Sequence, residues 1–280
     1  YEMRTCLVGS GMCIRDRYGL KEIVEFSESG STPYDVILSV ESEPLGTGGA
    51  VANAIPMLTG TGPVIILNGD LISSVDVRAL LSQHQKTGAS ATLSLWEVED
   101  PSRFGVCDLD DSGMIRRFQE KPERGTEFSN LINAGCSIVE RSILDSLPTG
   151  RFSMEREIFP GIAESGAMSG LVFQGYFVDA GTPPSFIQAA RECIQNNRFS
   201  TGLREGNNWY GEGAKSQGVV ENCSIGSGVI VSVGARLSDS VILDGAHIGE
   251  GVILKSCIVA RGAKVPANSV LSNEIIADSR

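Results

Sequence analysis

Residues 219–265 read VVENCSIGSGVIVSVGARLSDSVILDGAHIGEGVILKSCIVARGAKV. Aliphatic residues recur here with a period of six that is interrupted by two steps of five, at Val219, Ile225, Val231, Leu237, Leu243, Ile248, Leu254, Val259 and Val265. A sustained period of six predicts short strands stacked as a left-handed parallel β-helix, and about nine hexads predict about three coils over residues 218–272. The alternative, an antiparallel sandwich of valine-rich strands, would show a period of two.

The residues before this tail show a different rhythm. Across residues 18–198, short apolar runs alternate with segments of helical periodicity, which is typical of an α/β domain with a Rossmann-like, mainly parallel sheet. We expect strands over residues 35–40, 63–67, 90–96 and 131–139, helices over residues 47–58, 75–86 and 183–195, and a hairpin over residues 104–119. Residues 199–217, rich in Gly and Asn, predict a linker, and residues 273–280 a short tail.

The first 17 residues, YEMRTCLVGSGMCIRDR, fit neither pattern. They resemble a translated library adapter, so we interpret residues 1–17 as a foreign or disordered segment and expect the sheet to be incomplete at its N-terminal side. The alternative is a genuine, loosely packed tail.

Composition narrows the class of partner. Lys and Arg number 23 against 34 Asp and Glu, for a net charge of −11, so the surface would repel nucleic acid. Seven cysteines without a C-x-x-C pair indicate buried thiols in a reducing compartment. No apolar run approaches the roughly 20 residues that span a bilayer. We expect a cytoplasmic protein with neither a nucleic-acid nor a membrane partner, and a surface position for His84 on its predicted helix.

Two aspartates follow apolar runs. Asp70 ends VIILNGD at residues 64–70, and Asp179 lies in FVDAGTP at residues 177–183. Ligands of open α/β sheets bind beyond the strand ends, and Mg²⁺ is usually held by one or two carboxylates with phosphate and water. The sequence therefore predicts a divalent-metal site, although each segment alone is also an ordinary turn.

Three further segments carry candidate binding groups. EPLGTGGAVANA at residues 43–54 feeds glycines into a helix, which lets backbone approach a base or phosphate, although a plain tight turn would look the same. In RFQEKP at residues 117–122, Glu120 can accept from sugar hydroxyls and Lys121 can meet a phosphate, unless the two form a surface ion pair. The side-chain amide of Asn133, in the segment NAG, can also read a hydroxyl.

Together and in this order, these segments resemble the nucleotide-sugar pyrophosphorylases, above all the mannose-1-phosphate and related sugar-1-phosphate guanylyltransferases. SRFGV at residues 102–106 and SMEREIFP at residues 153–160 fit the same family. The resemblance implies that Asp70 and Asp179 hold Mg²⁺, that Lys121 is the catalytic lysine, and that these three form the catalytic set. It implies a nucleotide site at Gly48, Gly49, Asn68 and Asp70, and a sugar-phosphate site at Gly105, Glu120, Lys121 and Asn133.

The implied reaction is attack of a sugar-1-phosphate oxygen on the α-phosphorus of a nucleoside triphosphate, which releases pyrophosphate and forms GDP-mannose or a similar nucleotide sugar. The family's triphosphate loop, G-G-x-G-T-R-L followed by P-K-P, has no match here. We therefore expect this chain, as given, to bind triphosphate poorly. The base and the sugar stay open.

Two other functions fit parts of the chain. A regulatory subunit of the same family would bind a nucleotide sugar without making it, although it would have no need of a complete metal pair. Acyl transfer by the β-helix would need a histidine base, and His247 is the one histidine in the repeats. We interpret the β-helix as an assembly module and expect a homo-oligomer.

Overall fold

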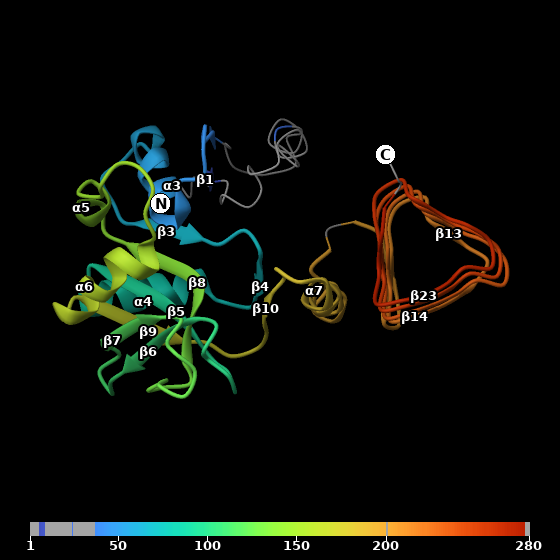
Figure 1. Ribbon diagram of the computed structural model, residues 1–280. Coiled ribbons are helices and arrows are strands. Elements are labelled where there is room, and N and C mark those ends of the chain that lie inside the picture. The colour runs from blue at the N-terminus through green and yellow to red at the C-terminus, as the bar shows by residue number, and fades with distance from the viewer. Residues whose placement is uncertain (1–5, 9–23, 25–36, 200, 278–280) are drawn as a thin grey trace. The chain divides into compact units, whose positions relative to one another are not determined.

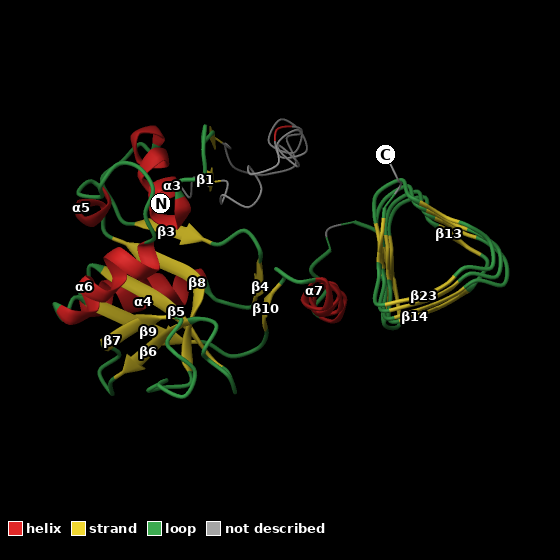
Figure 2. Cartoon of the chain, in the orientation of Figure 1, coloured by secondary structure: helices red, strands yellow, loops and turns green. Residues whose placement is uncertain are grey.

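The computed structural model describes residues 6–8, 24, 37–199 and 201–277 (Figures 1 and 2). The chain divides into two compact units. The first contains Tyr1–Gly69 and Ser74–Gly175, and the second contains Asp70–Ser73 and Tyr176–Arg280. No helix of the described residues is long and apolar enough to cross a bilayer.

A six-stranded sheet forms the centre of the first unit. The strand order is β7 (Ile115–Glu120), β6 (Gly105–Leu109), β8 (Leu131–Val139), β5 (Ala91–Glu97) and β9 (Met168–Val172), and β3 (Val64–Leu67) also pairs with β8. β5 and β9 run parallel, and the other pairs of this sheet are antiparallel. The predicted strands over 63–67, 90–96 and 131–139 and the hairpin are all present, and the α/β fold class is confirmed.

Helices flank this sheet. They are α3 (Gly46–Ala54) with the 3₁₀ turn Ile55–Met57, α4 (Val77–Thr87), α5 (Arg141–Leu144), the π-helix η2 (Met154–Ile158) and α6 (Phe159–Glu164). β1 (Cys6–Val8) pairs in parallel with β2 (Ile37–Ser39), so three residues of the segment set aside as foreign form a strand. The other residues of that segment lie outside the described part of the chain.

Helix α4 shows how local signals position a buried face. Asp76 accepts from the N–H groups of Arg78 and Ala79 at the start, and Gly88 ends the helix with φ 63°. Leu80 and His84, four residues apart, share the face that packs inward. His84 is only 2% exposed, with its ring nitrogens 2.8 Å from the Thr92 hydroxyl and 3.1 Å from Glu140 Oε1. The expected surface position of His84 is therefore wrong.

The second unit begins with a two-stranded ribbon, in which β4 (Leu71–Ser73) pairs antiparallel with β10 (Phe177–Asp179). Helix α7 (Pro183–Gln195) follows and starts with a capping box formed by Thr182 and Ser185. The hairpin of β11 (Leu203–Glu205) and β12 (Asn208–Tyr210) then leads into the β-helix. Part of the stretch predicted as a linker is therefore regular structure.

The β-helix has three faces. The first contains β12, β15 (Ser224–Ile225), β18 (Val241–Ile242), β21 (Ile258–Val259) and β24 (Ile275–Ile276); the second contains β13 (Lys215–Ser216), β16 (Ile230–Val231), β19 (His247–Ile248) and β22 (Lys264–Val265); the third contains β14 (Val219–Glu221), β17 (Arg236–Ser238), β20 (Ile253–Lys255) and β23 (Val270–Ser272). Two of the faces have four strands each, so the predicted parallel β-helix is confirmed with four coils rather than about three.

Each coil takes 17 residues, because Val219 pairs with Arg236 and Arg236 with Ile253. Two steps of six and one of five make up that length, and the short step turns at a residue in the left-handed region. These residues are Asn222, Asp239, Ser256 and Asn273, with φ of 54°, 51°, 51° and 56°. The two positions next to a short step were assigned one residue off: Val220 and Ile242 face the interior, whereas Val219 is exposed and Leu243 only partly buried.

Helix α7 packs on the first face of the β-helix. Ile187 forms a buried cluster with Val241 and Ile258. Arg191 Nη2 donates to Asp239 Oδ1 at 2.6 Å, so a residue of the short turn also ties the helix to the coils. These contacts join α7 and the β-helix.

The cysteines behave as small apolar residues. Cys107, Cys136, Cys223 and Cys257 are free and buried, and Cys193 is partly buried. Burial is the main cause that raises the pKa of the Cys223 thiol to about 11, so this thiol stays protonated at neutral pH. The free thiols agree with the prediction that cysteines serve packing here.

Candidate functional site

The two predicted metal ligands lie on the β4/β10 ribbon of the second unit. The Ala180 N–H donates to the Asp70 carbonyl oxygen at 2.9 Å, and Asp179 pairs with Leu71, so the backbones of the two aspartates are direct neighbours. Asp70 is exposed in the turn before β4, and Asp179 is partly buried. Asp179 Oδ1 accepts from the Gly181 N–H at 2.9 Å, which orients its carboxylate. Strand pairing thus brings together two acids that are far apart in the sequence.

Two carboxylates are a plausible protein share of a magnesium site. Mg²⁺ keeps several waters and is usually bound through one or two carboxylates together with substrate phosphates. Among the described residues, no group of three or more His, Cys, Asp or Glu side chains could form an all-protein metal cage. The donor set of Asp70 and Asp179 therefore fits a hard cation that is shared with a phosphate.

Three of the predicted sugar-site residues form one row across the sheet of the first unit. Gly105 pairs with Glu120 between β6 and β7. Val106 pairs with Ile132 between β6 and β8, and the antiparallel register places Gly105 opposite Asn133. Residues directly opposite each other share a face of the sheet. Glu120 and Asn133 therefore stand on the same face, about 10 Å apart at two strand spacings, with a glycine between them.

The glycine in this row keeps space open. A Cβ at Gly105 would lie 2.5 Å from Cζ of Phe118 and 3.0 Å from Oε2 of Glu120. A side chain here would therefore displace the Glu120 carboxylate or the Phe118 ring. The row provides a carboxylate and an amide on either side of an open floor, which suits a ring with several hydroxyl groups.

Lys121 follows directly after β7 in an unusual conformation. Its φ is 45°, its N–H donates to the Phe104 carbonyl oxygen at 2.9 Å, and Pro122 comes next. Left-handed backbone at a non-glycine residue costs about 1–3 kcal/mol and is concentrated at functional sites. The Lys121 side chain is 56% exposed with Nζ 3.7 Å from Glu120 Oε1, whereas the Glu120 side chain is only 14% exposed. The ammonium is thus available to a ligand beside a sheltered carboxylate.

The environment raises the pKa of Glu120. Burial is the largest cause, and the charge of Glu155 adds to it, whereas Lys121 and Arg156 act in the opposite direction. Perturbed acids of this kind gather at functional sites.

Asn68 and Asn133 converge on one residue. The Asn68 N–H donates to the Gly135 carbonyl oxygen at 2.9 Å, and Asn133 Oδ1 accepts from the Gly135 N–H at 3.1 Å. Asn68 is exposed after β3, and Asn133 is partly buried on β8. The two predicted amides therefore share an anchor in the first unit.

The glycines of α3 pack against the protein itself. The N–H groups of Gly48 and Gly49 donate to the Phe152 carbonyl oxygen at 3.1 and 3.3 Å. A Cβ would overlap the Phe152 ring at Gly48 and the Gly150 carbonyl oxygen at Gly49. Both positions need glycine for this close approach, so the structure gives them a packing role. Their contact with a nucleobase stays a prediction.

One residue near this turn escaped the sequence analysis. Glu41 is only 4% exposed, and its Oε2 accepts from the Leu45 N–H at 3.0 Å. Its Oε1 is buried without a hydrogen-bond partner among the described residues. A buried acceptor without a partner is costly, and each such group in a native structure needs an explanation. A glutamate four residues before a glycine turn carries no signal of this burial in the sequence.

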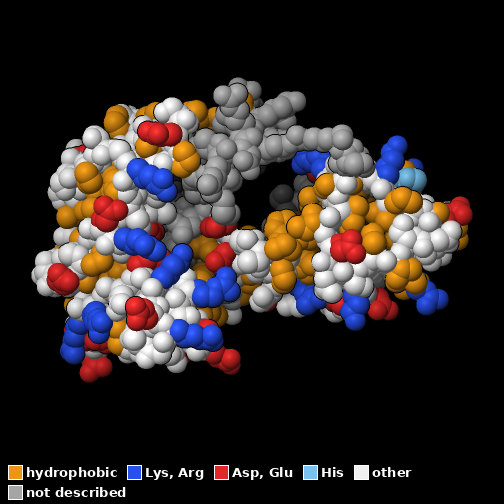
Figure 3. Space-filling view, in the orientation of Figure 1, with side chains coloured by type: hydrophobic (Ala, Val, Ile, Leu, Met, Phe, Trp, Pro, Cys, Tyr) orange, Lys and Arg blue, Asp and Glu red, His pale blue; other side chains and the backbone are white. Residues whose placement is uncertain are grey.

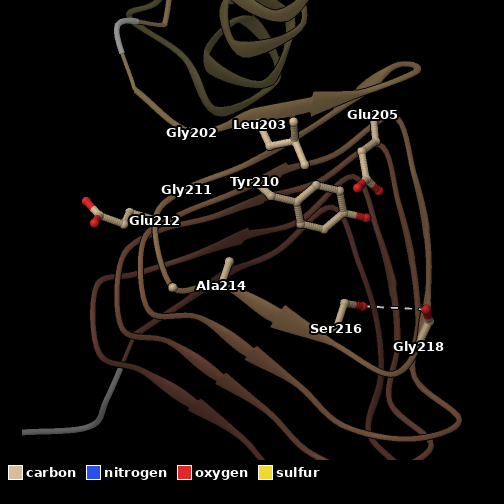
Figure 4. Close-up of a pocket in the computed structure, with 10 residues that line it drawn as sticks. Gly202, Leu203, Glu205, Tyr210, Gly211, Glu212, Ala214, Ser216 and Gly218 are labelled. Carbon is tan, nitrogen blue, oxygen red and sulfur yellow. Dashed lines mark hydrogen bonds between the residues drawn. The ribbon is translucent and has the colours of Figure 1, made fainter.

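A cavity of about 640 Å³ lies elsewhere, at the mouth of the β-helix (Figure 4). The labelled side chains include Glu205, Tyr210 and Glu212, and none of the predicted site residues contributes to it. Burial, followed by the charge of Glu205, raises the pKa of Tyr210. Two carboxylates and no Lys or Arg among its lining residues make it a poor phosphate site.

The visible face offers no continuous basic surface. In Figure 3, Lys and Arg side chains are interspersed with Asp and Glu. His247, the candidate acyl-transfer base, is exposed on the second face of the β-helix between Ile230 and Lys264. This position gives it no enclosed site within the described residues.

Comparisons with known proteins follow the division into two regions. Residues 14–196 match the family described as Nucleotidyl transferase, and residues 211–280 match the family described as GlmU-like, C-terminal hexapeptide. The first match covers most of the α/β region and begins inside the segment set aside at the N-terminus. The second agrees with the hexapeptide β-helix.

Curated relatives share one printed name. The probable mannose-1-phosphate guanylyltransferase 3 of Oryza sativa subsp. japonica is 33% identical over 86% of this chain. The mannose-1-phosphate guanylyltransferase of Mycobacterium tuberculosis is 33% identical over 88%, and the catalytic subunit beta from Danio rerio is 37% identical over 82%. The chain spans 65%, 66% and 67% of the lengths of these three relatives.

Solved structures are similar as well. HddC from Yersinia pseudotuberculosis superposes with a TM-score of 0.52 at 28% identity, over 61% of this chain and 73% of that one. The structure of the same protein complexed with GMP-PN gives a TM-score of 0.51.

Proposed function

Because this chain belongs to the nucleotidyl transferase family, we propose that it joins GTP to a sugar 1-phosphate, with release of pyrophosphate and formation of GDP-mannose or a similar GDP-sugar. The row of Glu120, Gly105 and Asn133 is the observation that carries the proposal. Relatives named mannose-1-phosphate guanylyltransferase support the choice of product.

The row suits a sugar because of its donors, acceptors and space. An ionised carboxylate accepts hydrogen bonds, an amide both accepts and donates, and a hydroxyl can do either. Glu120 and Asn133 can therefore bind two hydroxyls of one ring above Gly105. Lys121, next in sequence to Glu120, would then meet the phosphate of the same molecule and counter the charge on the reacting oxygens.

The reaction requires positioning more than covalent chemistry. A sugar-phosphate oxygen attacks the α-phosphorus of the triphosphate, and the bond from that phosphorus to the pyrophosphate breaks. Holding two anions in line and offsetting their charge are the main tasks in transfers of this kind. Lys121 supplies one positive charge from the chain itself.

Asp70 and Asp179 would hold Mg²⁺, which they fit as two carboxylates on paired strands. When bound, the ion neutralises phosphate charge and orients the triphosphate. Asp179 is held in orientation by the Gly181 N–H, and Asp70 is exposed where a phosphate could reach the same ion.

Glu41 supports guanine as the base. The N1–H and the N2 amino group of guanine are adjacent donors, which match a carboxylate with a free acceptor, whereas adenine has no such pair on that edge. Glu41→Gln is expected to raise the KM for GTP about tenfold or more, because the replacement removes one acceptor and the charge. Steady-state kinetics with GTP and ATP measure the change. The exposed Glu43→Gln is the matched control, and equal losses for both bases would contradict guanine recognition.

Pyrophosphate release tests the proposed function directly. Four nucleoside triphosphates are screened against mannose 1-phosphate, glucose 1-phosphate and heptose 1-phosphate. We expect GTP with mannose 1-phosphate or heptose 1-phosphate to give the fastest turnover, at a low rate because residues 1–280 contain no G-G-x-G-T-R-L segment. Tight binding of a GDP-sugar without any turnover would favour the regulatory-subunit reading instead.

Assembly and location stay proposals. Val219, Ile253 and Val270 are exposed on the third face of the β-helix, in register with Arg236. An apolar column of this kind can bury itself against a second copy, which supports a homo-oligomer through the β-helix. A cytoplasmic site of action remains a prediction.

A further inference from the structure

Glu155 joins two parts of the first unit that are separate in sequence. The Thr47 hydroxyl, in the first turn of α3, donates to Glu155 Oε2 at 2.5 Å and accepts from the Met154 N–H at 3.1 Å. The Ser153 hydroxyl donates to the same carboxylate oxygen at 2.8 Å. Two hydroxyl donors on one oxygen hold the carboxylate in place and favour its ionised form.

Glu155 belongs to the π-helix η2, a rare element that is frequent at functional sites. Ser153 begins this helix by accepting from the Arg156 N–H. The next residue after Glu155 therefore faces the same region with the opposite charge. Glu155 and Arg156 are the charged residues of η2 that act on Glu120, and Lys121 acts on it from the end of β7.

We propose that Glu155 is a positioning residue, which ties the glycine turn of α3 to η2 and governs the charge with which Glu120 meets the sugar hydroxyls. This rests on the proposed function for the role of Glu120, but the link from Thr47 to Glu155 and the charge beside Glu120 are independent of it. Glu155 thus belongs to both halves of the site, through a hydrogen bond to the nucleotide side and through its field on the sugar side.

The sign of the expected pH effect follows from the charges. Glu120 accepts hydroxyl hydrogen bonds when ionised, and burial together with Glu155 raises its pKa. Sugar-phosphate affinity is therefore present above this raised pKa and is lost as the pH falls through it. Removing the charge of Glu155 lowers the pKa of Glu120, so affinity then persists to lower pH.

Two substitutions separate charge from geometry. Glu155→Gln keeps an oxygen for the hydroxyls of Thr47 and Ser153 and removes the charge. We expect the acid limb of kcat/KM for sugar 1-phosphate to move to lower pH, with the KM for GTP unchanged within about twofold. Glu155→Ala also removes the acceptor, so we expect the KM for GTP to rise roughly fivefold, the equivalent of one hydrogen bond.

Glu157→Gln is the matched control. Glu157 lies in the same π-helix, and its carboxylate accepts from the Ser153 N–H at 3.0 Å. It is not among the charged groups that act on Glu120, so its replacement should leave both the acid limb and the KM for GTP in place. Melting temperatures of all three variants show whether each one is folded.

A readout without turnover separates this proposal from the proposed function. The side-chain carboxyl ¹³C signal of Glu120 is titrated in the folded protein without substrates. A midpoint that falls in Glu155→Gln and stays in Glu157→Gln supports the proposal, even if no sugar phosphate reacts. An unchanged midpoint in folded Glu155→Gln overturns it, even if the wild type is an active enzyme. Loss of folding in Glu155→Gln moves the same measurement to Thr47→Val, which frees the carboxylate from its hydroxyl and should change the midpoint.

Discussion

Lys121→Met is expected to lower kcat for nucleotide-sugar formation by roughly 10²–10³-fold, the usual effect of removing one charge-stabilising group from a reacting phosphate or oxyanion. Methionine preserves the length and the unbranched shape of the side chain but removes its charge. The side chain is 56% exposed, so packing of the fold should change little. Rapid-quench or steady-state measurement of pyrophosphate release gives the rate.

Two further variants show whether the lysine acts through its charge and its position. Lys121→Arg keeps the charge but changes its shape, and we expect partial activity between that of the wild type and of Lys121→Met. Lys86→Met removes an exposed lysine from α4 and should leave kcat unchanged. A kcat for Lys121→Met within threefold of the wild type would remove this residue from the catalytic set.

Asp179→Asn should produce a comparable loss together with an altered response to metal. The amide can still accept from the Gly181 N–H, so the turn before α7 is expected to keep its shape. The neutral oxygen binds a hard cation more weakly. We expect the half-saturating Mg²⁺ concentration to rise at least tenfold and kcat to fall by roughly 10²-fold. Magnesium titrations of activity give both quantities.

Asp111→Asn is the control for this experiment, because Asp111 is exposed in the β6–β7 turn. Its response to Mg²⁺ should match that of the wild type. Asp70→Asn should resemble Asp179→Asn if both carboxylates hold the same ion. An unchanged Mg²⁺ titration for Asp179→Asn, with an intact melting temperature, would show that the ribbon does not bind the metal.

The elements with regular periodicity were predictable. The strand over residues 131–139 and the helix over residues 183–195 have the predicted bounds. The β-helix followed from its repeat, because an interior position every five or six residues requires a small aliphatic side chain. The position of each interior residue was harder, since Val219 and Val220 are both valine and only the turn at Asn222 decides which one faces inward.

Other elements carry little local signal. β4 and β9 are short strands of three and five residues, and their pairing depends on partners far along the chain. The π-helix η2 has no periodic pattern of its own. Burial of His84 also depends on tertiary packing, because a histidine at a helical position can face the solvent or the sheet equally well.

The site was predictable residue by residue, but its arrangement was not. Strand-end aspartates and the EKP segment are visible in the sequence, whereas the register that places Gly105 between Glu120 and Asn133 comes from two strand pairings. The sequence analysis assigned the α3 glycines to the nucleobase without foreseeing their contact with Phe152. Glu41 and Glu155 were missed because burial and long-range hydrogen bonds distinguish them from other glutamates.

The constant coil length of the β-helix makes its tail modular. A segment of 17 residues can be duplicated or deleted as a unit, because every strand then meets the partner position it had before and the column of left-handed turn residues stays aligned. A change of any other size would rotate interior valines and isoleucines toward water. Lengthening or shortening of the tail during evolution is therefore restricted to whole coils, whereas the surface of each coil is free to diversify.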